Sequence, residues 1–179
     1  MNYSRHRKAL TQWLAVTMSF FLLFNVMVIA DFGNSNVVNA VDPNIAINKN
    51  ASADSGNSTA STGNDDSIYT TWRADDGNNN HWWKVDLGAS YNLSGSEVMF
   101  ESTYLIKYKV EASSDNSTWT TVVNKTNNTS TAQTQTDVFT SSSKRYVRIT
   151  ITEVPSGVWA SFYEFRGFGA TGGGTPTPT

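Results

Sequence analysis

From residue 41 onward, no segment of the sequence keeps apolar residues at helical spacing for even three turns. Short runs that alternate apolar and polar residues recur instead, and clusters of Asn, Asp, Ser and Gly separate them. Such alternation is typical of half-buried strands in a sandwich or barrel. The clearest predicted strands are residues 82–87, 96–100, 106–112, 118–123, 145–151 and 162–168. We therefore predict an all-β antiparallel fold around a single core, for which about 130 residues suffice.

The predicted strand at residues 145–151 shows the alternation most clearly. Its three apolar residues share one face, while Arg148 and Thr150 share the other. An antiparallel sheet can bury one face and leave the other in water, so we expect Arg148 and Thr150 to be solvated. Residues 114–117, with the sequence Ser-Asp-Asn-Ser, predict a hairpin turn because Asp and Asn tolerate the backbone conformations that tight turns need.

The two ends of the chain have a different character. Residues 1–40 combine a basic start, an apolar run over residues 13–30 and a Val-Asn-Ala ending. These features predict a signal peptide cleaved after Ala40. The alternative is a retained membrane anchor, because the apolar run approaches the roughly 20 residues that span a bilayer. Residues 170–179, rich in Gly, Thr and Pro, predict a linker to a missing module that we expect to be catalytic.

Composition narrows the class of partner. Residues 41–179 contain six lysines and four arginines against fourteen acids, a formal charge of −4. This weakly acidic balance provides neither the basic stripe of a nucleic-acid-binding protein nor a polybasic patch for anionic lipid. The sequence has no cysteine, so a secreted domain would owe its rigidity to its core or to a bound metal rather than to disulfides. We expect an extracellular location and a bacterial source.

Catalysis by these residues is not expected. His81 is the one histidine in residues 41–179, and no nucleophile-elbow motif accompanies it. The sequence lacks the ligands for zinc, a phosphate-binding loop and a dinucleotide fingerprint. The adjacent acids at 65–66 and 75–76 fall in predicted loops, and their spacing does not indicate two carboxylates held across a cleft.

Six motifs follow one another in a defined order. They are Asn-Ile-Ala at 44–46, Trp72, Trp-Trp-Lys-Val-Asp-Leu-Gly at 82–88, Lys-Val-Glu-Ala-Ser-Ser-Asp-Asn-Ser-Thr-Trp at 109–119, Lys-Arg-Tyr-Val-Arg-Ile at 144–149 and Tyr-Glu-Phe-Arg-Gly-Phe-Gly at 163–169. Together they resemble the discoidin domain, or factor V and VIII type C domain, over residues 44–169. The resemblance implies a galactose-binding-like β-sandwich of jelly-roll type.

The resemblance also implies a function by analogy of fold. Bacterial secreted members of this family are mostly carbohydrate-binding modules, here closest to family 32, attached to glycoside hydrolases or polysaccharide lyases. We therefore expect a monomeric, non-catalytic module spanning residues 41–169 that binds a polysaccharide or oligosaccharide and targets a tethered enzyme to it. Two alternatives stay open: an adhesion domain that binds a protein or lipid partner, and a structural spacer that binds nothing.

A structural calcium site is a further implication of the resemblance. The matching positions are Asp65, Ser67, Thr70 and Glu164, and oxygen ligands of this kind suit Ca²⁺ rather than a transition metal. Asp66 stands where the family usually has glycine, so either the loop bends differently or Asp66 is itself a ligand. The alternative is a solvated acidic loop in which Glu164 caps backbone amides.

A sugar-binding site requires an exposed aromatic surface and a few fixed polar groups, on loops at one end of a rigid sandwich. Trp159, in the last loop before the closing strand, and Tyr104, between two predicted strands, are the candidates for that surface. The alternative for Trp159 is that it covers the mouth of the sandwich. The other aromatics considered are expected to be structural, with Trp72 and Trp82 at core positions of the family: Trp72, Trp82, Trp119, Tyr146, Phe162 and Phe165.

Polar contacts to the sugar are expected mainly from the loop between Arg73 and His81. The candidate donors and acceptors are Arg73, Asp75, Asp76, Asn79 and His81, with Glu101 as a further acceptor. Each of them taken alone also fits a solvated surface residue, and their concentration beside the predicted site favours binding. Their pattern does not identify the sugar.

Overall fold

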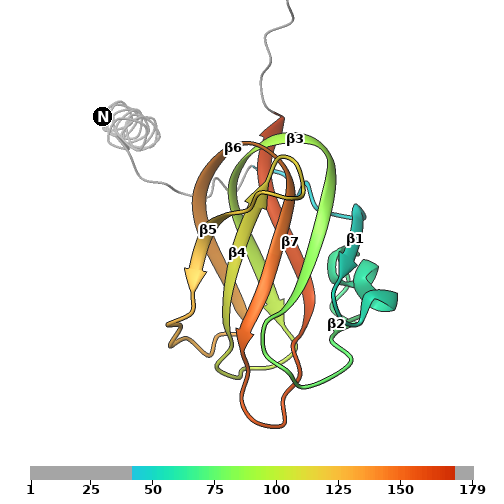
Figure 1. Ribbon diagram of the computed structural model, residues 1–179, viewed down its shortest axis with the longest axis vertical. Coiled ribbons are helices and arrows are strands. Elements are labelled where there is room, and N and C mark those ends of the chain that lie inside the picture. The colour runs from blue at the N-terminus through green and yellow to red at the C-terminus, as the bar shows by residue number, and fades with distance from the viewer. Residues whose placement is uncertain (1–41, 172–179) are drawn as a thin grey trace, which may run out of the picture. The chain divides into compact units, whose positions relative to one another are not determined.

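The computed structural model describes residues 42–171. The predicted signal peptide and the predicted linker from residue 172 onward lie outside the described residues. The elements are β1 (Asn50–Ala53), the 3-10 helix η1 (Asn57–Asn64), β2 (Trp72–Arg73), β3 (His81–Phe100), β4 (Lys107–Ser113), β5 (Thr120–Lys125), β6 (Thr134–Glu153) and β7 (Ser161–Thr171) (Figure 1). Within this range, no helix has the length and apolar character needed to cross a bilayer.

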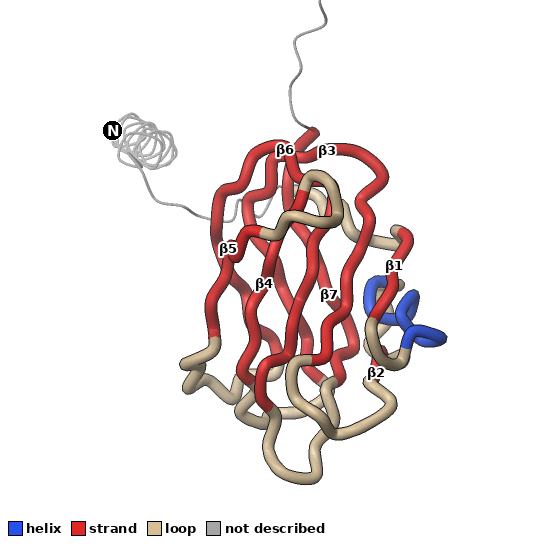
Figure 2. The backbone as a smooth tube through the Cα atoms, viewed as in Figure 1, coloured by secondary structure: helices blue, strands red, loops and turns tan. Residues whose placement is uncertain are grey.

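Strands dominate the described residues, as Figure 2 shows, and every pair of neighbouring strands is antiparallel. The predicted all-β antiparallel fold is therefore confirmed. Strand β7 continues through Thr171, so Ala170 and Thr171, which the sequence assigns to the linker, belong to the closing strand. The predicted hairpin turn at residues 114–117 joins β4 to β5.

The strands form two layers that are joined through β3 and β6. One layer contains β1, residues 81–86 of β3, residues 146–153 of β6, β4 and β5. The other contains residues 91–100 of β3, residues 134–144 of β6, β7 and β2. Strands β3 and β6 are each 20 residues long and pair with each other in both layers, so they carry the chain from one sheet of the sandwich to the other.

The bend between the layers lies between residues 86 and 95 of β3, where the pairing with β6 shifts register three times. Such irregularities bend a strand and increase its twist. Gly88 in this segment has a φ of 82°, a conformation that glycine adopts at little cost. The sequence predicts two separate strands at 82–87 and 96–100, but the structure joins them because the polar stretch between them keeps pairing through the bend.

The largest side chains of the core between the layers are aromatic. Phe162 of β7 packs against Trp72 and Trp83, with ring centroids 5.0 Å and 5.5 Å away. Trp83 also contacts Phe165 at 5.4 Å. The indole N–H of Trp83 donates a 2.7 Å hydrogen bond to the carbonyl of Ala60, so this large ring is buried without an unsatisfied donor.

Trp82 is not the core tryptophan that the family positions predict. Successive residues of a strand point to opposite faces, and Trp83 shares its face with Val85 and Leu87, which are fully buried like Trp83 itself. Trp82 lies on the opposite face, half-buried, with the ammonium of Lys84 5.2 Å from its ring centroid. The alternation with Val85 and Leu87 is the signal in the sequence that gives the correct face.

Two other aromatics expected to be structural lie at the outer surface of the sheet. Trp119 and Tyr146 are both half-buried. The guanidinium of Arg148 lies 4.2 Å from the ring centroid of Trp119, and that of Arg145 lies 5.2 Å from the ring of Tyr146. Tyr146 is therefore not a core residue, and both rings contribute through cation–π contacts.

The expectation that Thr150 is solvated is also wrong. Thr150 is 7% exposed, and its hydroxyl donates to Oε2 of Glu111 at 3.3 Å. The carboxylate of Glu111 is itself buried and pairs with Lys109 and Arg148, each at 2.9 Å. An ion cluster therefore covers this part of the outer face, since a buried carboxylate needs compensating partners.

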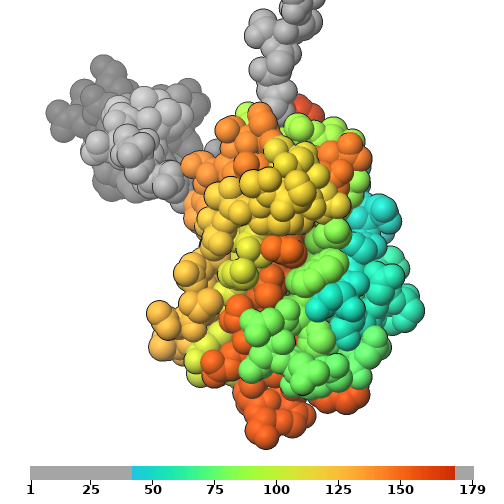
Figure 3. Space-filling view, in the orientation of Figure 1, coloured from blue at the N-terminus to red at the C-terminus, as the bar shows by residue number. Residues whose placement is uncertain are grey.

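Both ends of the described chain lie at the same end of the sandwich. Asn44 forms a bridge with Phe168, and the backbone N–H of Ile45 donates to the carbonyl of Gly167 at 2.8 Å. The loop that precedes β7 lies at the other end of that strand (Figure 1). In the space-filling view of Figure 3, this orange-red loop protrudes at the lower end of the molecule.

Candidate functional site

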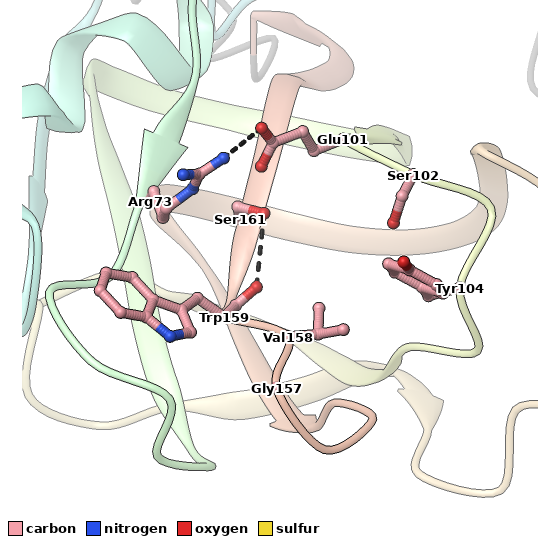
Figure 4. A pocket seen from close by; sticks show the side chains of 8 residues that line it. All are labelled: Arg73, Glu101, Ser102, Tyr104, Gly157, Val158, Trp159 and Ser161. Carbon is pink, nitrogen blue, oxygen red and sulfur yellow. Dashed lines mark hydrogen bonds and ion pairs between the residues drawn. The ribbon is translucent and has the colours of Figure 1, made fainter.

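An open pocket of about 450 Å³ lies at the end of the sandwich opposite the chain ends. Its lining residues, drawn in Figure 4, are Arg73, Glu101, Ser102, Tyr104, Gly157, Val158, Trp159 and Ser161. They come from β2, the segment between β3 and β4, the loop between β6 and β7, and the start of β7. The volume falls in the range of roughly 300–1,000 Å³ that small-molecule sites occupy.

The loop between β6 and β7 holds Trp159 in a partly exposed position. A backbone hydrogen bond of 3.0 Å closes a turn over residues 155–158, and Gly157 within it has a φ of 79°, as the third residue of a type II turn requires. The backbone N–H of Ala74 then donates to the carbonyl of Ala160 at 2.9 Å, which fixes the loop against the end of β2. Trp159 is 45% exposed, so the indole offers an apolar surface to a ligand.

Tyr104 lies across the pocket from Trp159 in Figure 4 and is 52% exposed. Along one side of the pocket, the guanidinium of Arg73 donates to the carboxylate of Glu101 (Figure 4). Burial alone would raise the pKa of Glu101, but hydrogen bonds from Arg73 and Ser161 outweigh it and hold that pKa below its usual value. The pocket therefore combines two aromatic surfaces with a fixed pair of opposite charges.

The other polar candidates hold the loop in place. Oδ2 of Asp75 accepts a 2.7 Å hydrogen bond from the backbone N–H of Gly56, and Asp75 lines a second cavity next to the pocket. Oδ1 of Asn79 accepts a 3.3 Å hydrogen bond from the backbone N–H of Val154. The structure thus gathers Trp159, Tyr104, Arg73 and Glu101 around one pocket and places Asp75 beside it, whereas Asp76, Asn79 and His81 line neither of these two cavities.

His81 is buried between two carboxylates. Its Nε2 lies 2.8 Å from Oδ1 of Asp76, and its Nδ1 lies 3.2 Å from Oδ2 of Asp54. Burial alone would lower the pKa of His81, but the hydrogen bonds to Asp76 and Asp54 outweigh it and raise the pKa above the usual value. Only the imidazolium donates from both ring nitrogens, so the charged form of His81 ties the loop at residues 74–80 to the segment after β1.

That loop also supports the aromatic surface of the pocket. Gly77 lies beside the indole of Trp159, where a Cβ would make an ordinary van der Waals contact of 3.4 Å with Cδ1 of the ring. His81 and its two carboxylate partners therefore anchor the loop that lies beside Trp159.

The residues predicted to bind calcium come together at a different place. The hydroxyl of Thr70 donates to both carboxylate oxygens of Asp65 at 2.9 Å, and the backbone N–H of Ser67 donates to Oδ1 of Asp65 at 3.0 Å. Oε2 of Glu164 accepts a 3.0 Å hydrogen bond from the backbone N–H of Asp66, which links β7 to this loop. One carboxylate oxygen of Glu164 therefore caps a backbone amide, as the alternative to a calcium site predicts.

The other oxygen of Glu164 makes this group of residues suitable for a cation. Glu164 is 2% exposed, and its Oε1 is buried with no hydrogen-bond partner. Burial, reinforced by the negative charges of Asp65 and Asp66, raises the pKa of Glu164 to about 7. In residues 42–171, no three or more His, Cys, Asp or Glu side chains group as a metal site, so hydroxyl and carbonyl oxygens would complete the ligands, as Ca²⁺ accepts.

Asp66, at the position where the family usually has glycine, adopts a backbone conformation that glycine reaches at little cost. Its φ is 61°, in the left-handed region that Asp tolerates better than most residues. Its carboxylate pairs with Arg166 of β7 at 2.9 Å. The departure from glycine is therefore accommodated, and the loop still reaches Glu164.

A family model for the F5/8 type C domain matches residues 44–165. The chain belongs to the F5/8 type C domain family. This membership confirms the resemblance to the discoidin domain that the sequence motifs indicate. Among curated proteins, no match was found.

Several solved structures are similar to this F5/8 type C domain. Chitosan-binding module 1 from the chitosanase/glucanase of Paenibacillus sp. IK-5 is 31% identical with a TM-score of 0.64, over 71% of this chain and 99% of the module. Module 2 of the same enzyme, solved with chitotriose, is 24% identical with a TM-score of 0.63, over 70% of this chain and 100% of the module. The Clostridium perfringens module CpGH89CBM32-4, in complex with GlcNAc-α-1,4-galactose, is 24% identical with a TM-score of 0.61, over 75% of this chain and 98% of the module.

Several lining residues of the pocket carry no signal in the sequence. Ser102 and Ser161 are two serines among many in a Ser-rich chain, and Val158 is an ordinary apolar residue. The pairing of β2 with β7 aligns Ser161 with Arg73, and the pairing of β3 with β7 aligns Phe100, two residues before Ser102, with Phe162. These pairings join segments that lie far apart in the sequence.

Proposed function

We propose that residues 42–171 form a non-catalytic carbohydrate-binding module that targets a secreted, tethered polysaccharide-degrading enzyme to its substrate. The observation that carries this proposal is the convergence of Trp159, Tyr104 and the pair Arg73–Glu101 around one open pocket. Aromatic rings can cover the flat C–H face of a sugar, while a fixed guanidinium and carboxylate can bind its hydroxyl groups.

The similar structures support the same proposal. The Paenibacillus module that is 31% identical is a chitosan-binding module by name, and it belongs to a chitosanase/glucanase. The ends of the described chain lie opposite the pocket, so an enzyme attached there would leave the pocket open. A tethered module increases the effective concentration of the enzyme at its substrate without a tight individual contact.

The proposal is tested by native affinity electrophoresis of the folded module against a panel of polysaccharides that includes chitosan. We expect one class of polymer to retard the wild-type protein, and Trp159→Ala and Tyr104→Ala each to remove most of that retardation. Trp82→Ala is the matched control, because this half-buried tryptophan lies outside the pocket. Normal retardation of both pocket variants would remove the proposed site.

A folded wild-type protein that no polymer retards would contradict a carbohydrate ligand. Binding to lipid vesicles that persists in high salt and ignores added sugar would then favour the adhesion function instead. The negative formal charge of residues 41–179 argues against anionic membranes as the partner.

We also propose that a structural Ca²⁺ binds between the loop at residues 65–70 and Glu164. The support is the buried, unpartnered Oε1 of Glu164 beside the carboxylate and hydroxyl oxygens of Asp65 and Thr70. An ion at this place would connect β7 to a loop about 100 positions earlier in the chain.

If calcium binds here, Glu164→Gln should change the melting temperature in opposite directions with calcium and with chelator. With saturating calcium, the variant should melt at a lower temperature than the wild type because it loses a charged ligand. With chelator, it should melt at the same or a higher temperature, because the neutral amide avoids the cost of a buried carboxylate. Thermal melts of both proteins under both conditions test this, and a wild-type melting temperature that calcium does not change would contradict it.

A further inference from the structure

A second cavity of about 400 Å³ adjoins the pocket between Trp159 and Tyr104. It is lined by Ser58, Thr59, Thr71, Arg73, Ala74, Asp75 and Trp159. Trp159 and Arg73 line both cavities, so the indole and the guanidinium stand at the boundary between them. A ligand that stacks on Trp159 in the first cavity can therefore extend into the second.

The second cavity is polar and its charged group is held in place. Hydroxyl groups from η1 and from the segment before β2 line it, together with the carboxylate of Asp75. The backbone N–H of Asp75 donates to the hydroxyl of Ser55 at 2.8 Å, and Oδ2 of its side chain accepts from the N–H of Gly56 at 2.7 Å. Asp75 is nevertheless exposed, so its carboxylate is fixed at one oxygen and accessible to solvent.

The charges of the two cavities select the class of ligand. Each cavity has one carboxylate, Glu101 in the first and Asp75 in the second. Arg73 is the one cation that lines them in the described part of the chain, and it is paired with Glu101. The combined surface is therefore net negative, which repels uronate or sulfate groups and attracts a cation.

We propose that the two cavities are neighbouring subsites for one cationic oligosaccharide of at least two amino-sugar units, with Asp75 pairing with an ammonium group in the second subsite. This inference rests on the proposed function and deepens it. Trp159 is shared by both units, and the hydroxyl groups of the second cavity bind the ring hydroxyls of the outer unit.

The test is calorimetric titration of the protein with β-1,4-linked glucosamine oligomers of one to four units. The same oligomers in N-acetylated form serve as the uncharged comparison, and galacturonate oligomers as the anionic one. For the wild type we expect affinity to rise about tenfold or more between one and three glucosamine units, a difference of about 1.4 kcal/mol. We expect this affinity to fall with added salt and to exceed that for both other series.

The Asp75→Asn variant isolates the second subsite. Asparagine keeps an oxygen that can accept from Gly56, so the loop is expected to stay in place while the negative charge is lost. The variant should bind the glucosamine monomer like the wild type but lose most of the gain with chain length. Asp42→Asn is the matched control, because it removes one carboxylate from the first described residue, which lines neither cavity.

Three results would overturn the inference while leaving the proposed function standing. They are equal affinity for the monomer and the longer oligomers, an unchanged gain with length in Asp75→Asn, and tighter binding of galacturonate than of glucosamine oligomers. Absence of binding to all three series would overturn it as well. The polysaccharide panel then decides whether the proposed function fails with it.

Discussion

Trp83 and Trp82 are neighbours with the same side chain and opposite burial. We expect Trp83→Ala to lower the free energy of unfolding by about 3–5 kcal/mol, because it leaves a cavity beside Phe162. It also removes the donor that satisfies the carbonyl of Ala60. Trp82→Ala should cost about 1 kcal/mol or less, since a half-buried outer ring leaves no cavity.

Urea denaturation of both variants measures this difference, with the slope of the transition as a check that the denatured state is unchanged. Equal losses for the two variants would mean that Trp83 does not fill the core as described. The sequence already indicates which tryptophan is buried, because Trp83, Val85 and Leu87 are spaced two residues apart and therefore share one face of the strand.

Among the elements, the loop at residues 74–80 is held in part by the side chain of His81. His81 donates to Asp76 and Asp54 when protonated, and its pKa in the folded state is raised. The folded state therefore keeps this proton at pH values where the unfolded chain has lost it. The resulting stabilisation is fully present below about pH 6.5, the unperturbed value, and is lost as the pH rises through the folded pKa.

We expect the melting temperature of the wild type to fall relative to that of His81→Gln as the pH rises above about 6.5. Glutamine can keep one hydrogen bond but cannot titrate, so the variant serves as the reference for all other groups. Melting curves between pH 5.5 and 8.5 measure the difference. If the melting temperatures of the two proteins changed with pH in parallel, His81 would not stabilise the loop in its charged form.

At the scale of the whole molecule, the position of the chain ends decides how the module can be joined to other domains. Strand β7 has 11 residues, so at about 3.3 Å per residue it separates the two ends of the sandwich by roughly 35 Å. We expect a reporter domain fused after Thr171 to leave the affinity for the retarding polysaccharide unchanged.

A short Gly-Ser insertion after Gly157 is the contrasting change. It alters the loop that carries Trp159, and we expect it to abolish retention while the melting temperature changes little, because loop insertions at exposed turns are tolerated. Affinity gels and thermal melts of both proteins give the comparison. Loss of retention in the C-terminal fusion would contradict the proposed separation of linker and site.

The sequence alone determined the fold class, the family and most of the aromatic candidates. Alternation of apolar residues is a local signal, and the ordered motifs from Asn44 to Gly169 carry the family. Two predictions were wrong for different reasons. The family positions predict Trp82 as a core residue, although the alternation with Val85 and Leu87 favours Trp83. The alternation stops in the polar stretch within β3, but pairing with β6 and β7 carries the strand through it.

Only the tertiary structure decided which candidates share a site. Arg73, Glu101, Tyr104 and Trp159 come from three separate segments, and the pairing of β2 with β7 brings Arg73 beside Ser161 and the loop of Trp159. In the folded protein, His81 and Asp76 do not line the pocket and form a hydrogen bond with each other instead. A sequence gives the chemical character of each side chain, whereas the long-range pairing of strands decides which side chains are left free to meet a ligand.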